Sequence, residues 1–358
     1  MKQYYFFVII MTLMSCNTNK ETEPKDTLSY PQEIHLKNIK QLTYNGDNAE
    51  AYFSFNDKKL VFQSNNSDWN VSCDQIFLTD TNNYTMKEEI PTKISTGFGR
   101  TTCSYFLPGD STIVYASTHL VDSLCPQEPE RREDGKYVWP IYSGYDIFTA
   151  DLNGNIITQL TNSPGYDAEA TVSPNGDKIV FTSIRSGDLE LYTCDIDGSN
   201  VIQVTDVLGY DGGAFFSNDG KKLVFRASRP QSEEDIHNYK TLLKEGLVQP
   251  TKMELFTCDV DGSNLKQITN LGNANWAPFF HPSDEKIIFS SNHKSQRGFP
   301  FNLFMIDTTG HNLKQISFDT TFDSFPMFSH DGKKIVFSSN RNNNGTRNTN
   351  LFIADWNE

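Results

Sequence analysis

The chain has 358 residues and a formal net charge of −14, with 21% charged and 13% aromatic residues. A nucleic-acid-binding protein normally presents a basic face, so this acidic balance argues against nucleic acid as a partner. Phe, Tyr, Gly, Asn and Asp are abundant, and long apolar stripes at helical spacing are scarce. This composition predicts an all-β fold.

The first fifteen residues, MKQYYFFVIIMTLMS, read as an export signal. The apolar run of residues 4–14 is too short to span a bilayer comfortably. It ends in LMSC, which resembles the site where a bacterial lipoprotein signal is cleaved before a lipidated cysteine, here Cys16. Residues 16–33 are then expected to form a flexible tether, and Asn17 favours the outer membrane. The alternative is an ordinary secretion signal with a chance cysteine.

The remaining cysteines give no zinc framework, because there is no C-x-x-C spacing among them. An exported protein can form disulfides, but the sequence does not pair Cys73, Cys103 and Cys125. Cys194 and Cys258 occupy equivalent positions in two repeats and are expected to be small buried residues.

A repeated unit runs through the chain after the tether. It consists of a strand, a turn such as SPNGDK, a short apolar strand such as KIVF, a third strand, a turn and a fourth strand. We name these strands A to D. With insertions removed, the period is about forty residues, which is typical of a propeller blade. Six copies of strand B end at Phe62, Tyr115, Phe181, Phe225, Phe289 and Phe337.

The turns TCDIDGSN at residues 193–200 and TCDVDGSN at residues 257–264 resemble the start of a calcium loop. A helix–loop–helix calcium site needs a bidentate Glu at position twelve. Counting from Asp195, position twelve is Asp206, and a strand-like VIQVT fills the interval. The pattern therefore favours a tight turn between strands C and D, with Gly198 as its turn residue.

The two ends of the chain complement each other. The sequence stops at TNLFIADWNE, after a third strand, whereas residues 34–43, IHLKNIKQLT, match the fourth strand of other repeats. We expect this N-terminal strand to complete the last blade and remove two open sheet edges. The predicted fold is thus an all-β, six-bladed propeller of four-stranded blades over residues 34–358.

The S-P-x-G-x-K-I-V-F strands, the SSNR segment at residues 338–341 and the D-x-D-G-S-N turns resemble the TolB-type six-bladed β-propeller, built from WD40-like repeats. The resemblance covers about residues 34–356 and implies the fold and the bacterial cell envelope. The N-terminal α/β domain of TolB has no counterpart here, so the role of TolB is not carried over.

Long insertions fall mostly between strands B and C, so one face of the propeller is expected to be elaborated and the other to consist of plain turns. Residues 232–246 are predicted to form a helix that begins after Ser232 and ends at Gly246. Another insertion carries Trp139, an aromatic that either stacks on a guest or anchors its own loop. One shorter insertion, residues 81–90, falls instead between strands C and D. The B–C insertions are residues 65–72, 118–145, 228–252, 292–301 and 340–349.

Two columns of polar residues are expected to meet at the elaborated end of the channel, because strands A and B form an antiparallel hairpin. One column begins strand A and the other follows strand B; Glu50 and Glu169 lie two residues further along strand A. Either a guest binds these groups, or they join neighbouring blades. The columns are Asn48, Thr101, Asp167, Asp211, Asn275 and Asp323, and Asn66, His119, Arg185, Arg229, His293 and Arg341. From them we predict a binding rim of His119, Arg185, Arg229, His293, Arg341, Asp167, Asp211, Asn275, Asp323 and Glu169.

Two functions remain open from the sequence. The first is a monomeric, lipid-anchored binding propeller of the envelope that holds a protein, peptide or glycan and needs no cofactor. The second is a metal-assisted lyase or hydrolase of oligosaccharides, in which His119 and His293 join carboxylates around a divalent ion. The sequence contains no G-x-S-x-G, H-E-x-x-H or P-loop motif, which favours the first.

Overall fold

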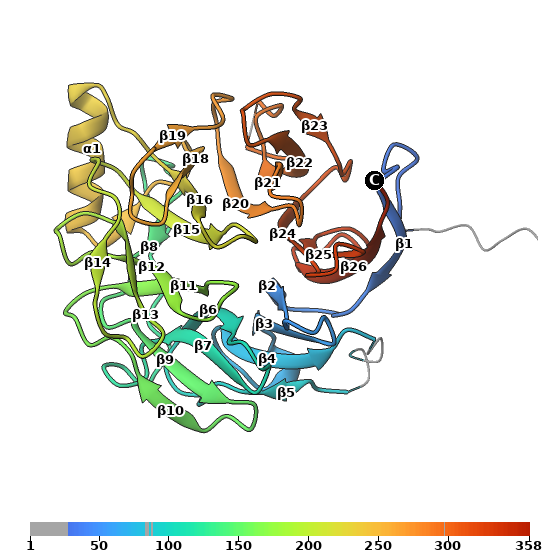
Figure 1. Cartoon of the computed structure of the whole chain (residues 1–358), viewed down its shortest axis with the longest axis horizontal. Helices are drawn as coiled ribbons and strands as arrows, with labels where there is room; N and C mark the ends of the chain where they lie inside the picture. Colours follow the sequence, from blue (N-terminus) through green and yellow to red (C-terminus); the bar gives the residue numbers. More distant parts are fainter. Residues whose placement is uncertain (1–27, 83–85, 87–88, 297) are drawn as a thin grey trace, which may run out of the picture.

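The computed structural model describes residues 28–82, 86, 89–296 and 298–358. Six four-stranded sheets are arranged as blades around a central axis, which confirms the predicted propeller (Figure 1). The predicted signal peptide, Cys16 and most of the tether lie outside the described residues, as does part of the C–D insertion. None of the helices in the described part of the chain has the length and apolar character needed to cross a membrane.

The strands follow the chain from blade to blade, with strand A innermost. Blade 1 contains β2 (Asp47–Phe53), β3 (Lys59–Asn65), β4 (Gln75–Asp80) and β5 (Thr92–Lys93); blade 2 contains β6 (Thr101–Phe106), β7 (Thr112–Ser117), β9 (Asp146–Asp151) and β10 (Ile156–Gln159). Blade 3 contains β11 (Asp167–Val172), β12 (Lys178–Ser183), β13 (Glu190–Asp195) and β14 (Ile202–Gln203); blade 4 contains β15 (Asp211–Phe216), β16 (Lys222–Ala227), β18 (Glu254–Asp259) and β19 (Lys266–Gln267). Blade 5 contains β20 (Asn275–Phe280), β21 (Lys286–Ser291), β22 (Asn302–Asp307) and β23 (Lys314–Gln315); blade 6 contains β24 (Asp323–Phe328), β25 (Lys334–Ser339), β26 (Asn350–Trp356) and β1 (Leu36–Gln41).

The last blade is closed by the N-terminal strand, as the sequence predicts. β1 pairs antiparallel with β26, with Leu36 opposite Trp356 and Gln41 opposite Phe352. Both ends of the described chain therefore belong to one sheet, and the ring has no open edge at its seam.

The B strands are buried on both sides, because each blade is packed between two others. Phe181 and Phe225 are 0% exposed. Each stacks on an aromatic ring of its own strand C, with centroids 6.0 Å apart in the Phe181–Tyr192 and the Phe225–Phe256 pair. This repeated pair explains why the short apolar run recurs in every repeat.

The tight turns lie on the face opposite the insertions, which we call the turn face. In TCDIDGSN, Gly198 has φ +85° and donates its N–H to the Asp195 carbonyl, and Asn200 donates to the Asp195 carboxylate. Ser199 donates to Asp197 in the same way. Both carboxylates are occupied by local hydrogen bonds, so the motif is a turn.

The B–C insertions form a second layer on the other face, which we call the elaborated face. Helix α1 (Glu233–Lys244) begins after Ser232, whose hydroxyl accepts the Asp235 N–H, so the predicted helix is confirmed. Two further short strands, β8 (Trp139–Pro140) and β17 (Leu247–Val248), pair with each other although they come from blades 2 and 4. The first insertion contains a 3-10 turn, Ser67–Trp69.

One disulfide ties the insertions of neighbouring blades together. Cys73 and Cys125 are bonded, while Cys103, Cys194 and Cys258 are free. Cys194 and Cys258 are each 1% exposed, which confirms that they are small buried residues.

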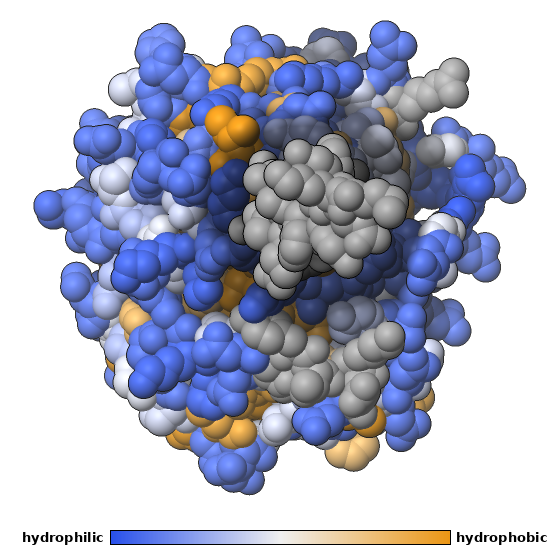
Figure 2. Space-filling model, turned by 90° about the vertical axis from the view of Figure 1, so that its right-hand side faces the viewer, coloured by the Kyte–Doolittle hydropathy of each residue, from blue (hydrophilic) through white to orange (hydrophobic). Residues whose placement is uncertain are grey.

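The side of the molecule shown in Figure 2 is mostly hydrophilic, and its described hydrophobic residues lie in separate patches.

Candidate functional site

The two predicted columns meet inside each blade. Arg185 donates to the Asp167 carboxylate at 2.8 Å, and Arg229 donates to both oxygens of Asp211. Asp167 and Asp211 are 0% exposed, whereas 23% of the Arg185 side chain and 18% of the Arg229 side chain remain exposed. These two carboxylates are thus buried, whereas the Arg185 and Arg229 side chains still reach solvent.

The two histidines of the rim occupy blades 2 and 5 and do not approach each other. His119 bonds the Ser117 hydroxyl at 2.9 Å, and its ring lies 4.6 Å from that of Phe148. His293 bonds Ser291 at 2.9 Å in the same way. Burial lowers the pKa of both histidines, which favours their neutral forms. Asn275 is fully buried and accepts from Ser291.

The turn face contributes hydrogen bonds between neighbouring blades. Asp57 accepts the N–H groups of His330 and Asp331. Asp284 accepts those of Asn218 and Asp219 in the same geometry. The Asp–Arg pairs of the columns join two strands of one blade, so they do not themselves join neighbouring blades.

Arg341 differs from the other arginines because it binds the N-terminal segment. Its guanidinium donates to Asp323 at 3.0 Å, to Glu33 at 3.0 Å and to the Leu28 carbonyl at 2.9 Å. The three side chains are 3%, 0% and 0% exposed for Arg341, Glu33 and Asp323. This cluster holds the start of the described chain against blade 6.

A ring of bulges lines the channel beneath the elaborated face. Every A–B strand pair shifts register near the third residue of strand A, which is the fourth residue in β2. That residue has a positive φ in all six blades, which is uncommon for residues other than glycine. Most of these residues keep intermediate exposure, whereas the next residue along each strand is buried. We call this set the bulge ring: Glu50, Cys103, Glu169, Gly213, Ala277 and Phe325.

Blades 3 and 4 place an ion pair in the bulge ring. Glu169 accepts from Arg226, from the Tyr210 hydroxyl at 2.8 Å and from the Gly213 N–H at 2.9 Å. A Cβ at Gly213 would lie 1.8 Å from the Arg226 guanidinium, and one at Gly212 would lie 2.4 Å from Glu169. The tandem glycine therefore makes room for this pair.

The electrostatics of that pair favour both charged forms. Burial acts to raise the pKa of Glu169, but the Arg226 charge and the hydrogen bonds from Thr182 and Tyr210 outweigh it and hold the pKa below its ordinary value. Burial acts to lower the pKa of Arg226, but the negative charge of Glu169 outweighs that effect and raises the pKa above its ordinary value.

Blades 1 and 2 place a carboxyl and a thiol in the bulge ring. The Cys103 thiol donates to Glu50 Oε2 at 2.8 Å. Burial raises the pKa of Glu50 to about 7; the thiol hydrogen bond opposes that rise and the Glu169 charge adds to it. Burial also raises the pKa of Cys103. No described cation forms an ion pair with Glu50.

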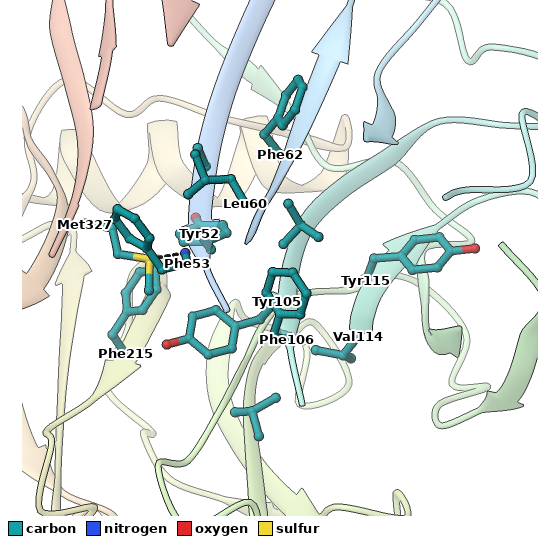
Figure 3. Close-up of a cluster of buried hydrophobic side chains, with 14 of the residues drawn as sticks. Tyr52, Phe53, Leu60, Phe62, Tyr105, Phe106, Val114, Tyr115, Phe215 and Met327 are labelled. Carbon is teal, nitrogen blue, oxygen red and sulfur yellow. Dashed lines mark hydrogen bonds between the residues drawn. The ribbon is translucent and has the colours of Figure 1, made fainter. Parts of the chain in front are cut away.

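Aromatic rings close the channel two residues further along strand A. Tyr52, Tyr105 and Phe215 converge there (Figure 3), with ring centroids 5.6 to 6.3 Å apart. They are 8%, 6% and 8% exposed, respectively. These rings, which we call the floor, block the channel between the bulge ring and the turn face.

The insertions of blades 2 and 4 cover part of the elaborated face above blade 3. Besides the β8–β17 pair, Arg132 donates to Glu245 at 2.8 Å. Trp139 reaches towards the channel, with its ring 5.5 Å from the Arg226 guanidinium and 4.9 Å from the Trp276 ring. A cleft of about 550 Å³ lies between α1 and these insertions, lined in part by Arg132, Lys136, Arg229, Tyr239 and Lys252.

Sequence reasoning placed both columns and Glu50 and Glu169, but it missed Arg226 and Cys103. The missed signal is the column directly after the aromatic residue of strand B, where Arg226 replaces neutral residues. The other five are Gln63, Ala116, Thr182, Ser290 and Ser338. A charged residue in an otherwise neutral buried strand needs a partner.

Within the described residues, no group of three or more His, Cys, Asp or Glu side chains is arranged to hold a metal ion. The bulge ring offers charge and hydrogen bonds beside aromatic surface, an arrangement suited to non-covalent recognition.

Fold and site together define a six-bladed β-propeller with a blocked channel beneath an elaborated face. This fold is similar to the TolB propeller, and residues 142–247 match the family model described as the TolB beta propeller domain. No curated protein matches the sequence significantly.

Solved structures show the same fold at low sequence identity. A protein provisionally designated TolB from Agrobacterium tumefaciens is 19% identical with a TM-score of 0.57, over 87% of this chain and 91% of that one. TolB from Acinetobacter baumannii is 17% identical with a TM-score of 0.52, over 88% of this chain and 65% of that one. An oligogalacturonate lyase solved in complex with manganese is 12% identical with a TM-score of 0.50, over 89% and 90% of the two chains.

Proposed function

We propose that the chain is a lipid-anchored binding propeller of the bacterial cell envelope. It holds a protein, peptide or glycan partner at the elaborated face and the channel mouth, as a monomer without a cofactor. The observation that carries the proposal is the asymmetry of the two faces. One face has insertions joined by β8–β17 above a blocked channel, and the other has short turns. Ordered loops on a rigid scaffold are where binding usually occurs.

Two further features support the envelope. The Cys73–Cys125 disulfide is typical of a protein that matures in an oxidising compartment. Leu28, where the described chain begins, lies beside Arg341 at the elaborated end of blade 6. A tether from Cys16 therefore reaches the propeller at the same end as the insertions.

The partner is tested by capture from a detergent extract of the envelope with two surface variants. Tyr137 and Ile202 are 58% and 56% exposed, on the blade 2 insertion and on the outer strand β14. We expect Tyr137→Ala to reduce capture of a specific partner and Ile202→Ala to leave it unchanged. Equal capture by both variants, or no saturable partner, contradicts the proposal for this face.

The lipid anchor is tested separately. We expect the intact chain to incorporate radiolabelled palmitate and to fractionate with membranes, and Cys16→Ser to do neither. A Cys16→Ser protein that keeps the label refutes anchoring at this residue and leaves the binding proposal standing.

A metal-assisted lyase is not proposed, since no observation on the described residues favours it. His119 and His293 lie in different blades, and each bonds a serine of its own blade. Similarity to the lyase structure extends to the fold alone.

A further inference from the structure

The bulge ring is polar and charged on one side of the channel and apolar on the other. Its members in blades 1 to 4 carry or contact charged groups, and those in blades 5 and 6 are Ala277 and Phe325. Five of the six are not glycine, yet all have φ between 42° and 60°. Such a conformation is unfavourable by about 1 kcal/mol for each L-residue that carries a Cβ. Repetition of this strain around the channel marks the ring as a place where side chains are held for contact.

The charges of the ring do not balance. Glu50 and Glu169 are carboxylates, and Arg226 is a cation that pairs with Glu169. Arg226 is committed to Glu169 and Tyr210 on the wall formed by blades 3 and 4. With all three groups ionised, the described ring therefore carries one uncompensated negative charge, at Glu50.

Glu50 has a free hydrogen-bonding side. Its Oε2 accepts from the Cys103 thiol, and no described residue donates to its Oε1. A thiol is a weak donor and leaves the carboxylate poorly neutralised. The raised pKa of Glu50 has the same origin, because burial without a counter-ion disfavours the charged form.

The floor supplies the second half of a cation site. Tyr52 lies two residues beyond Glu50 in β2, and its ring meets those of Tyr105 and Phe215. An aromatic face attracts a cation placed within about 6 Å of its centroid. A carboxylate beside aromatic rings in a confined space suits an ammonium or guanidinium group better than an anion or a neutral polar group.

We propose that the channel is a socket for an ammonium or guanidinium group presented by the partner, with Glu50 as counter-ion and the floor rings beneath it. A lysine or arginine side chain, or an N-terminal amine, has this chemistry. The identity of the group as part of a partner rests on the proposed function, whereas the socket itself does not. Ala277 and Phe325 contact the aliphatic part of such a guest.

Cys103 provides a reporter inside the socket. It is partly exposed, whereas Cys194 and Cys258 are 1% exposed and Cys73 and Cys125 are bonded to each other. The full chain is treated with 2-aminoethyl methanethiosulfonate, a cation, or with 2-sulfonatoethyl methanethiosulfonate, an anion. Labelling of the Cys103 peptide is followed by mass spectrometry, and each rate is divided by the rate with glutathione.

We expect the cationic reagent to label Cys103 faster, and Glu50→Gln to reduce the ratio of the two rates roughly fivefold or more. Any change in thiol pKa affects both rates equally and cancels in the ratio. Glu285→Gln, an exposed change on the turn face, removes the same charge and should leave the ratio unchanged. An equal ratio in the Glu50→Gln and Glu285→Gln proteins, or no labelling of Cys103, overturns the socket.

A second measurement tests the guest. N-acetyl-arginine methylamide should slow labelling of Cys103 by neutral methyl methanethiosulfonate, and the citrulline analogue, which lacks the charge, should not. Equal protection by both, or by neither, overturns cation recognition. These outcomes are independent of partner capture by the Tyr137→Ala protein, so failure of the socket and failure of the proposed function are distinguishable.

Discussion

Arg341→Met should be among the most destabilising single substitutions in the chain. The guanidinium makes hydrogen bonds to Asp323, Glu33, Leu28 and Ser339, and both carboxylates are 0% exposed. Removal of one partner of a buried ion pair costs about 3–5 kcal/mol, because the remaining charge stays buried without compensation. Glu33 retains the Phe318 and Tyr30 N–H groups, whereas Asp323 loses every side-chain partner described for it.

The free energy of unfolding is best measured by urea titration with tryptophan fluorescence, since urea does not screen charges. Adding Asp323→Asn to the Arg341→Met protein should recover about 1 kcal/mol or more, because it removes the unpaired charge. Lys59→Met is the control. The Lys59–Asp80 pair is exposed, and such pairs contribute about 0–1 kcal/mol. A loss below about 1 kcal/mol for Arg341→Met, or no recovery in the double variant, refutes the reasoning.

Three further predictions concern other parts of the propeller. Gly213→Ala should lower the urea midpoint by the equivalent of about 1–3 kcal/mol, because the new Cβ meets the Arg226 guanidinium at a positive φ; an unchanged midpoint contradicts the geometry. Cys73→Ser, which opens the link to Cys125, should cost about 2–4 kcal/mol and make unfolding insensitive to reductant; a reductant effect that persists assigns the disulfide elsewhere. Burial raises the pKa of Glu190 to about 8, so between the ordinary value of 4.5 and 8 the folded state holds a proton that the unfolded chain has released, and this group's contribution to stability falls as pH rises through that window. Glu190→Gln should therefore be more stable than the wild type at pH 8.5 and similar to it at pH 4; the same difference at both values excludes the proton linkage.

The fold was accessible from sequence because each repeat contains its own turn chemistry. Gly198 and its equivalents mark the C–D turns, and the buried KIVF strands mark the middle of each blade. The N-terminal strand was predictable because its residues match those of other D strands, so pairing of β1 with β26 follows from similarity alone.

The site was less predictable because it depends on backbone conformation and long-range pairing. Nothing in the residue types announces a positive φ at Glu50, Cys103 or Phe325, which are side chains that seldom adopt it. β8 and β17 are strands of two residues each, from insertions in different blades, and too short to carry a period-two pattern.

The disulfide shows the same limit. Pairing of Cys73 with Cys125 depends on how two loops of neighbouring blades approach each other, and the spacing of 52 residues does not encode that approach. Cys103 lies in the same region of sequence, but its place in β6 turns it into the channel.

The attachment of the N-terminal segment also has a mechanical consequence. Force applied to the chain upstream of Leu28 meets the Arg341, Glu33 and Asp323 cluster before it reaches β1. Peeling of β1 from β26 would open the seam of the ring, so the buried cluster relieves the closing strand of that load. If the propeller were held at its N-terminal end and pulled by a bound partner, the Arg341, Glu33 and Asp323 cluster would thus break first, while the blades stay folded.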